Sequence, residues 1–270
     1  MSVKLLRYVN TFALALTVCV NALANIIPIG IGTTGDVSKK YGNLFTPAPY
    51  TFIIWGFIYL CLLAFVLYGW GLFDGDGKNG RSREVVDSIG LWFTLGCIFN
   101  IGWIFTWHFD AIGLSTIMIA ALLVTLIFAN RALGRIKLGI VDMLCAGLGF
   151  GVYYGWIIAA TIANVSVWLV KLFPNTAEST QVIITCAVLA LGAFIGTLAA
   201  VKDGKYLPTV AVIWAYCGII IRHVSPDGYG GKYLSIILTA IVSIAVMAVG
   251  IFAAYIINRD RKKKLGYISR

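Results

Sequence analysis

Residues 138–170 read LGIVDMLCAGLGFGVYYGWIIAATIANVSVWLV, a stretch whose one charged residue is Asp142, about one turn from its start. A transmembrane helix needs about 20 mostly apolar residues, so this stretch is long enough to cross a bilayer. The rest of the chain is similar: 60% of its 270 residues are hydrophobic and 12% are charged, against about a quarter charged in soluble domains. The composition predicts an all-α integral membrane protein and excludes a large soluble domain.

Hydropathy predicts about eight spans joined by short loops. The loop around Pro174 is the one plausible seam, and it divides five helices from three. We therefore expect a five-helix transmembrane unit over 1–172, a three-helix unit over 173–258 and a basic cytoplasmic tail over 259–270. The expected spans are 8–29, 47–71, 86–107, 111–130, 138–170, 181–201, 206–222 and 233–257.

The positive charge indicates membrane orientation rather than nucleic-acid binding. The formal net charge is +10, and a cytoplasmic N-terminus places 16 of the 21 Lys and Arg residues on the cytoplasmic side. This bias follows the positive-inside rule. We expect both termini in the cytoplasm, a cell-membrane location in contact with lipid, and no nucleic-acid partner. The first segment resembles a signal peptide, but its apolar character continues through Ile29, which favours a retained helix.

The sequence contains no HExxH, no Gly-rich phosphate loop and no GxSxG, so hydrolytic or phosphoryl-transfer catalysis has little support. The six cysteines fall singly in apolar runs and are expected to be small buried hydrophobes rather than metal ligands. His108 and His223 lie at predicted helix ends, where a solvated or interfacial imidazole is expected. Asp142 is expected to pair with Arg135 or Lys137. The uncharged middle of every span disfavours a proton relay.

Aromatic and amide side chains recur at helical spacing in three spans, so each set shares one helix face. Tyr and Trp offer flat apolar faces with one hydrogen-bond donor each, which suits a flat hydrophobic ligand with polar edges. The sets are Phe52, Trp55 and Tyr59, then Asn100, Trp103 and Trp107, then Tyr153, Trp156, Ala160, Asn164 and Trp168.

The same aromatic residues are also compatible with two further classes of membrane protein. In a structural membrane protein they would only pack or lie at the membrane interface. In a secondary transporter, eight helices would enclose a path for a small hydrophobic or amphipathic solute. A fourth aromatic set, from Pro208 to Tyr216, either extends a cavity or packs against the core.

The segment Phe45–Tyr59, FTPAPYTFIIWGFIY, resembles the second-helix signature of the TspO/translocator protein family, the tryptophan-rich sensory proteins. Asn100-Ile101-Gly102-Trp103 resembles the third-helix motif of the family. Tyr153-x-x-Trp156-x-x-x-Ala160-Thr161-x-x-Asn164-x-x-x-Trp168 is similar to the fifth-helix motif. The resemblance covers roughly residues 8–170 and leaves 171–270 outside it.

The resemblance implies a TspO-like five-helix bundle, here followed by three further transmembrane helices. It implies that the bundle binds porphyrins or other tetrapyrroles, as sensor, carrier or scavenger, with no required cofactor and with porphyrin or haem as ligand. The loop Gly30–Thr46 would cover the pocket. A homodimer is a further expectation. The ligand-binding residues expected from the resemblance and the aromatic spacing together are Trp55, Tyr59, Asn100, Trp103, Tyr153, Trp156, Ala160 and Asn164.

Porphyrin degradation driven by light or oxygen is attributed to this family, and Trp55 and Trp156 are the redox-capable candidates for it. We do not expect a conventional enzyme. The chain also departs from the family, since prolines usual beside the signature tryptophans are replaced. The replacing residues are Ile53, Ile104, Phe105 and Val152. After the fifth helix the sterol motif lacks its Tyr, so sterol binding is not expected.

Overall fold

The computed structural model describes residues 2–27, 29–73, 80–203 and 206–264, and its elements are helices. In these ranges seven helices are long and apolar enough to cross a membrane. The number rises to eight if the bent pair α4 (Arg81–Ile89) and α5 (Trp92–His108) is one span. The prediction of an all-α membrane protein is confirmed. The chain divides into two compact units, 1–43 with 52–174 and 44–51 with 175–270.

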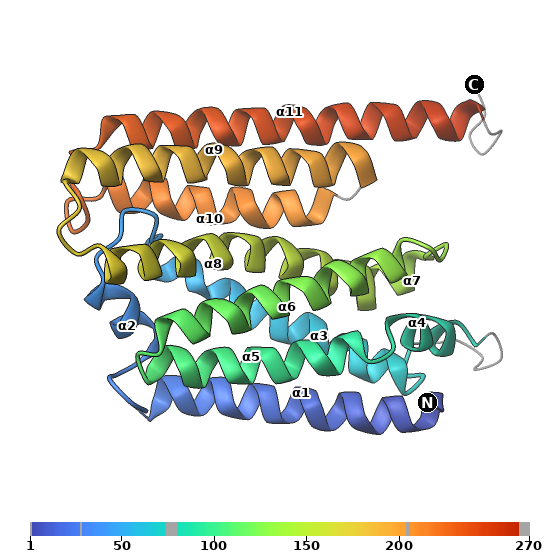
Figure 1. Cartoon of the computed structure of the whole chain (residues 1–270). Coiled ribbons are helices and arrows are strands. Elements are labelled where there is room, and N and C mark those ends of the chain that lie inside the picture. Colours follow the sequence, from blue (N-terminus) through green and yellow to red (C-terminus); the bar gives the residue numbers. More distant parts are fainter. Residues whose placement is uncertain (1, 28, 74–79, 204–205, 265–270) are drawn as a thin grey trace. The chain divides into compact units, whose positions relative to one another are not determined.

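The first unit holds the five predicted N-terminal spans, apart from residues 47–51 at the start of the second span (Figure 1). Helix α5 contacts both α1 and α6, α6 also packs on α8, and α3 contacts α1 and α8. A 3-10 turn at Pro49–Ile53 leads into α3. The remaining helices of the unit are α1 (Val3–Ile26), α2 (Thr34–Lys40), α3 (Ile54–Gly69), α6 (Ile112–Leu133), α7 (Ile140–Asp142) and α8 (Leu148–Leu172).

The third span differs from its prediction, because residues 86–107 do not form one straight helix. Helices α4 and α5 meet at an angle of 51°. Gly90 follows α4 with φ 55° and ψ −130°, a backbone conformation that glycine adopts without the steric penalty of a Cβ. Asp87, near the start of the expected span 86–107, therefore lies inside α4.

The fifth span is one apolar stretch, Ile140–Leu172, interrupted by a π-helical turn at Met143–Gly147. Small residues in membrane helices allow close contacts between helix backbones. Gly149 makes such a contact, since a Cβ there would lie 2.9 Å from the Cβ of Cys61 on α3. Backbone proximity at this point sets how closely α3 approaches α8.

The second unit contains three helices that contact one another, α9 (Glu178–Asp203), α10 (Tyr206–Val224) and α11 (Leu234–Lys264). Figure 1 shows them running side by side. Helix α11 continues through the start of the predicted basic tail, and residues 265–270 lie outside the described residues.

The segment Leu44–Thr51 belongs to this second unit and lies on α10. The Ala48 N–H donates to the Gly218 carbonyl at 3.0 Å, and the Trp214 indole donates to the Thr51 carbonyl at 2.9 Å. The Tyr216 hydroxyl donates to the carbonyl of Leu189 on α9 at 2.7 Å. The fourth aromatic set thus packs within its own unit.

Candidate functional site

Five rings from three helices meet in the first unit, and Trp55 on α3 is at their centre. Its ring stacks on Trp103 of α5, with centroids 5.9 Å apart, and on Tyr59, at 5.7 Å. It meets Tyr153 and Trp156 of α8 edge to face, at 5.8 and 6.1 Å. Offset stacks and edge contacts are the arrangements that aromatic quadrupoles favour. We call these five residues the aromatic cluster.

Asn164 joins the aromatic cluster to helix α6. The Trp103 indole N–H donates to Asn164 Oδ1 at 2.8 Å. The Asn164 amide in turn donates to Ser115 Oγ at 2.9 Å and to Thr116 Oγ1 at 2.8 Å. The Asn164 side chain is buried, so these bonds lie away from solvent. They fix the orientation of the Trp103 ring.

Asn100 joins the aromatic cluster to helix α1. The amide of Asn21 on α1 donates to Asn100 Oδ1 at 2.7 Å, and the Asn100 amide donates to the Tyr153 hydroxyl at 3.0 Å. Asn21 was not among the site residues expected from the sequence. Its signal was a set of polar residues, Asn10, Thr17 and Asn21, spaced so that they share a face of an otherwise apolar helix.

Two polar groups of the aromatic cluster are buried and make no hydrogen bond. The Trp156 indole N–H lacks a partner although the residue is only 3% exposed. The Tyr59 hydroxyl lies beside the Asn100 amide but makes no hydrogen bond of normal geometry with it. A buried donor without an acceptor costs about 1–3 kcal/mol. Such donors are positions where an acceptor of a bound molecule would recover that energy.

The structure places seven of the eight expected site residues in this one network of ring contacts and hydrogen bonds. The eighth, Ala160, is half-buried on α8 between Trp156 and Asn164. Of the other residues in the three aromatic sets, Phe52 meets Trp156 edge to face at 5.8 Å. Trp107 lies 6.1 Å from Trp103 and donates to the Thr34 carbonyl at 3.1 Å.

The first part of the expected lid lies against the end of α5. The Ile31 N–H donates to the His108 carbonyl at 3.0 Å. Gly30 has φ 66°, and a Cβ there would lie 2.1 Å from the same carbonyl oxygen. The close approach therefore requires glycine. Residues 30–43 belong to the first unit, whereas 44–46 belong to the second.

Asp110, in the turn after α5, contacts the end of the segment 30–43 and holds it in place. Its carboxylate accepts hydrogen bonds from Lys40 at 2.8 Å and from the Tyr41 hydroxyl, and Lys171 of α8 lies 3.3 Å away. Partial burial raises the pKa of Asp110, but hydrogen bonds from Lys40, Tyr41 and Lys171 outweigh that effect and hold its pKa below the ordinary 3.8. The carboxylate stays charged and holds two cations of different segments together.

Both histidines differ from their prediction, because each is fully buried rather than solvated. A His108 ring nitrogen is 2.7 Å from the Ile104 carbonyl. His223 Nε2 donates to the Leu44 carbonyl at 2.9 Å. Loop segments that follow earlier helices cover these two helix ends, which hydropathy of the helices alone does not reveal.

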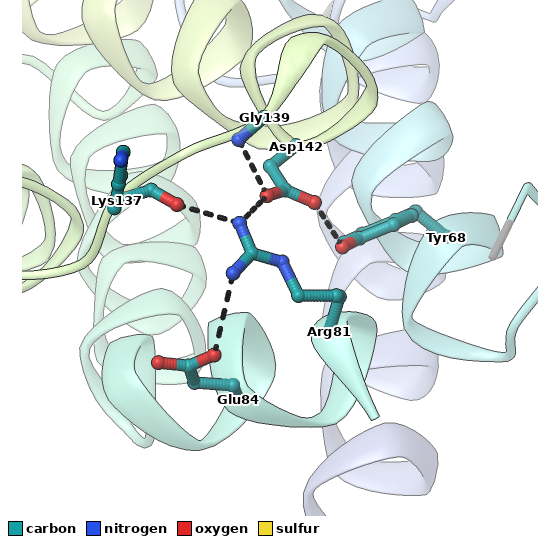
Figure 2. Close-up of polar contacts among 6 residues, drawn as sticks. All are labelled: Tyr68, Arg81, Glu84, Lys137, Gly139 and Asp142. Carbon is teal, nitrogen blue, oxygen red and sulfur yellow. Dashed lines mark hydrogen bonds and ion pairs between the residues drawn. The ribbon is translucent and has the colours of Figure 1, made fainter. Parts of the chain in front are cut away.

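A second polar cluster surrounds Asp142 at the start of the fifth span (Figure 2). One carboxylate oxygen accepts from the Tyr68 hydroxyl at 2.6 Å. The other accepts from Arg81 Nη2 at 2.7 Å and from the Gly139 N–H at 2.8 Å. Arg81 also donates to the Lys137 carbonyl at 2.5 Å. The contacts join the end of α3, the start of α4 and the start of α7.

The pairing expected for Asp142 was therefore wrong. The structure pairs it with Arg81, which lies two spans earlier in the chain, and Lys137 contributes its carbonyl rather than its ammonium. The bend between α4 and α5 turns α4 so that Arg81 reaches Asp142. Both oxygens of the carboxylate are engaged by groups of the protein itself, and we interpret this cluster as structural.

Cysteine and metal chemistry gives no further site among the described residues. All six cysteines are free, and no group of three or more His, Cys, Asp or Glu side chains in the described ranges could hold a metal ion. Cys61, Cys97 and Cys145 are buried as expected, whereas Cys19 is exposed on α1. A small apolar side chain on the face of a membrane helix costs little in lipid.

The family model for TSPO-like proteins matches residues 7–253. The chain belongs to the TSPO-like family. The match continues through α9 and α10 into α11, so it includes the three helices that the sequence resemblance left outside. No curated protein and no solved structure matches the chain.

Proposed function

We propose that the first unit of this TSPO-like protein binds a tetrapyrrole or a similar flat hydrophobic ligand at the aromatic cluster. The protein would then act as a sensor, carrier or scavenger of that ligand. The observation that carries the proposal is the buried Trp156 N–H, which lacks a partner within a group of large rings. Rings provide apolar faces, and an unsatisfied donor provides a polar anchor, the combination that ligand pockets use.

Binding in this site requires the rings to move. A planar molecule inserted between two rings needs about 7 Å between them, since each aromatic contact takes about 3.5 Å. Trp55 and Trp103 have centroids 5.9 Å apart. We therefore propose that the ligand displaces Trp55, which is half-buried. Trp103 is held by its bond to Asn164 and would stay in place.

Replacing Trp156 by phenylalanine should weaken protoporphyrin binding about tenfold, because the ligand loses one hydrogen bond worth about 1–1.5 kcal/mol. The measurement is quenching of tryptophan fluorescence in purified protein titrated with protoporphyrin. Trp92→Phe is the matched control. Trp92 is on α5, but it stacks on Phe128 at 4.4 Å, away from the aromatic cluster. Its replacement should leave the affinity unchanged.

Saturable binding that both variants preserve at full affinity would show that the ligand binds elsewhere on the protein. No saturable quenching in the wild type would contradict the proposal itself. Tyr59→Phe separates hydrogen bonding by the aromatic cluster from its ring contacts, since it keeps a ring and removes only the hydroxyl. We expect a loss of affinity no larger than that of Trp156→Phe.

We also propose that residues 30–43 cover the site and that Asp110 holds them closed. Asp110→Asn should speed ligand association about two- to thirtyfold, because partly exposed ion pairs contribute about 0.2–1 kcal/mol each and two are lost. Stopped-flow quenching measures this rate. Glu178→Gln is the control, since it breaks an exposed ion pair with Lys232 in the second unit and should not change it.

The ion pairs of Asp110 also predict how the rate of ligand association depends on pH. The pKa of Asp110 is lowered in the folded protein from 3.8. Its stabilising contribution is therefore complete above about pH 4 and is lost as the pH falls through the lower folded pKa. Association should be independent of pH near neutrality and should accelerate only in acid. Acceleration between pH 6 and 8 would assign the effect to another group.

A further inference from the structure

The hydrogen bonds around Asn100 have a defined direction. A side-chain amide has one acceptor end and one donor end. Asn21 donates to Asn100 Oδ1 at 2.7 Å, which requires the NH₂ end of Asn100 to point the other way. That end meets the Tyr153 hydroxyl at 3.0 Å. The orientation of the Asn100 amide is thus set by a residue of α1 that lies outside the aromatic cluster.

The donor-to-acceptor direction of these hydrogen bonds continues at the Tyr153 hydroxyl. Its oxygen accepts from Asn100 at 3.0 Å, and among the described residues this hydroxyl donates no hydrogen bond of its own. The Tyr59 hydroxyl lies beside the same amide, and the Trp156 N–H is also without an acceptor. The aromatic cluster therefore holds three polar protons without an acceptor, those of Tyr153, Tyr59 and Trp156.

We propose that Asn21 is the positioning residue that sets this polarity, and that the site consequently selects flat ligands carrying hydrogen-bond acceptors, such as carboxylates, on their edges. The inference rests on the proposed function and adds its specificity. Without Asn21, the Asn100 amide is free to turn over. Its oxygen would then accept the Tyr153 proton, and the site would lose a donor.

Asn21 is itself held in place. Its amide also donates to the Thr17 carbonyl one turn earlier, at 2.9 Å. Asn100 is fully buried and Asn21 is 7% exposed, so water does not compete for these groups. Asn25 is a natural control on the same helix, since its amide donates only to the Asn21 backbone carbonyl, at 2.8 Å, and does not contact Asn100.

The test compares two porphyrins with the same ring. Protoporphyrin carries two carboxylates, and octaethylporphyrin carries only alkyl groups at its edge. The full-length protein in detergent is titrated with each, and the ratio of the two affinities is compared between variants, so that partition into micelles cancels. In Asn21→Leu the affinity for protoporphyrin relative to octaethylporphyrin should fall about tenfold, which is the equivalent of one hydrogen bond. Asn25→Leu should keep the wild-type ratio.

A readout without ligand tests the same step. The ring-mode doublet of tyrosine in Raman spectra reports whether the hydroxyl donates or accepts a hydrogen bond, and subtraction of the Tyr153→Phe spectrum isolates Tyr153. Tyr153 should change from acceptor to donor in Asn21→Leu and stay an acceptor in Asn25→Leu. Asn21→Ala removes the same amide without added bulk and provides a second variant if Asn21→Leu does not fold.

The outcomes separate this inference from the proposed function. If both porphyrins bind and neither the ratio nor the doublet changes in Asn21→Leu, the role of Asn21 is overturned while the binding site stands. If the wild type binds neither porphyrin, the proposed function fails and the selectivity proposed for the site fails with it. A doublet that still changes would then support only the role of Asn21 in orienting Asn100.

Discussion

Replacing Asp142 by alanine should lower the free energy of unfolding by about 3 kcal/mol, the low end of the cost of breaking a buried ion pair. The Tyr68 hydroxyl would lose its bond to the carboxylate, and so would the Gly139 N–H. The estimate is at the low end because the Arg81 side chain is 41% exposed and regains water when its partner is removed. Titration with a denaturing detergent, followed by circular dichroism, measures the loss.

Two substitutions calibrate this result. Asp142→Asn keeps the shape and one acceptor oxygen, so it should cost less than alanine. Glu84→Gln removes the other carboxylate near Arg81, which is exposed and 3.9 Å away, and should change stability by less than about 0.5 kcal/mol. Equal stability of Asp142→Ala and the wild type would mean that packing of α3, α4 and α7 holds this end of the unit without the ion pair.

Periodicity and length explain what the sequence predicted well. Apolar length alone identifies a spanning helix, because the bilayer sets the number of residues. The spacing of Trp55 and Tyr59, or of Tyr153 and Trp156, places each pair on one helix face whatever the neighbours are. A bundle must turn such faces toward one another or toward lipid. The ring contacts around Trp55 show that these turn inward.

Partners across helices could not be predicted in the same way. Asn21 and Asn100 are 79 residues apart, and no local pattern states which polar residues of two spans will meet. Arg81 reaches Asp142 only because the chain bends at Gly90. A glycine in a predicted span is the signal for such a bend, but its direction depends on packing. The buried histidines depend on loop positions, which hydropathy does not encode.

Asn164→Leu should lower the free energy of unfolding by about 2 kcal/mol, within the cost of a buried donor left without an acceptor. Leucine has a similar volume, so the loss comes from hydrogen bonds rather than from a cavity. The Trp103 indole N–H loses its acceptor at 2.8 Å. Ser115 loses both its bonds to Asn164, whereas Thr116 keeps its bond to the Ile112 carbonyl. The same detergent titration measures the change.

A double-mutant cycle decides whether the Trp103 bond accounts for the loss. Trp103→Phe removes the N–H, so in that background Asn164→Leu leaves no orphaned indole and should cost about 1 kcal/mol less than it does alone. Ser115→Ala should cost only about 0.6 kcal/mol, the usual contribution of a hydrogen bond between membrane helices. Additive losses from Trp103→Phe and Asn164→Leu would mean that the indole finds another acceptor, and that Trp103 is oriented by its ring contacts alone.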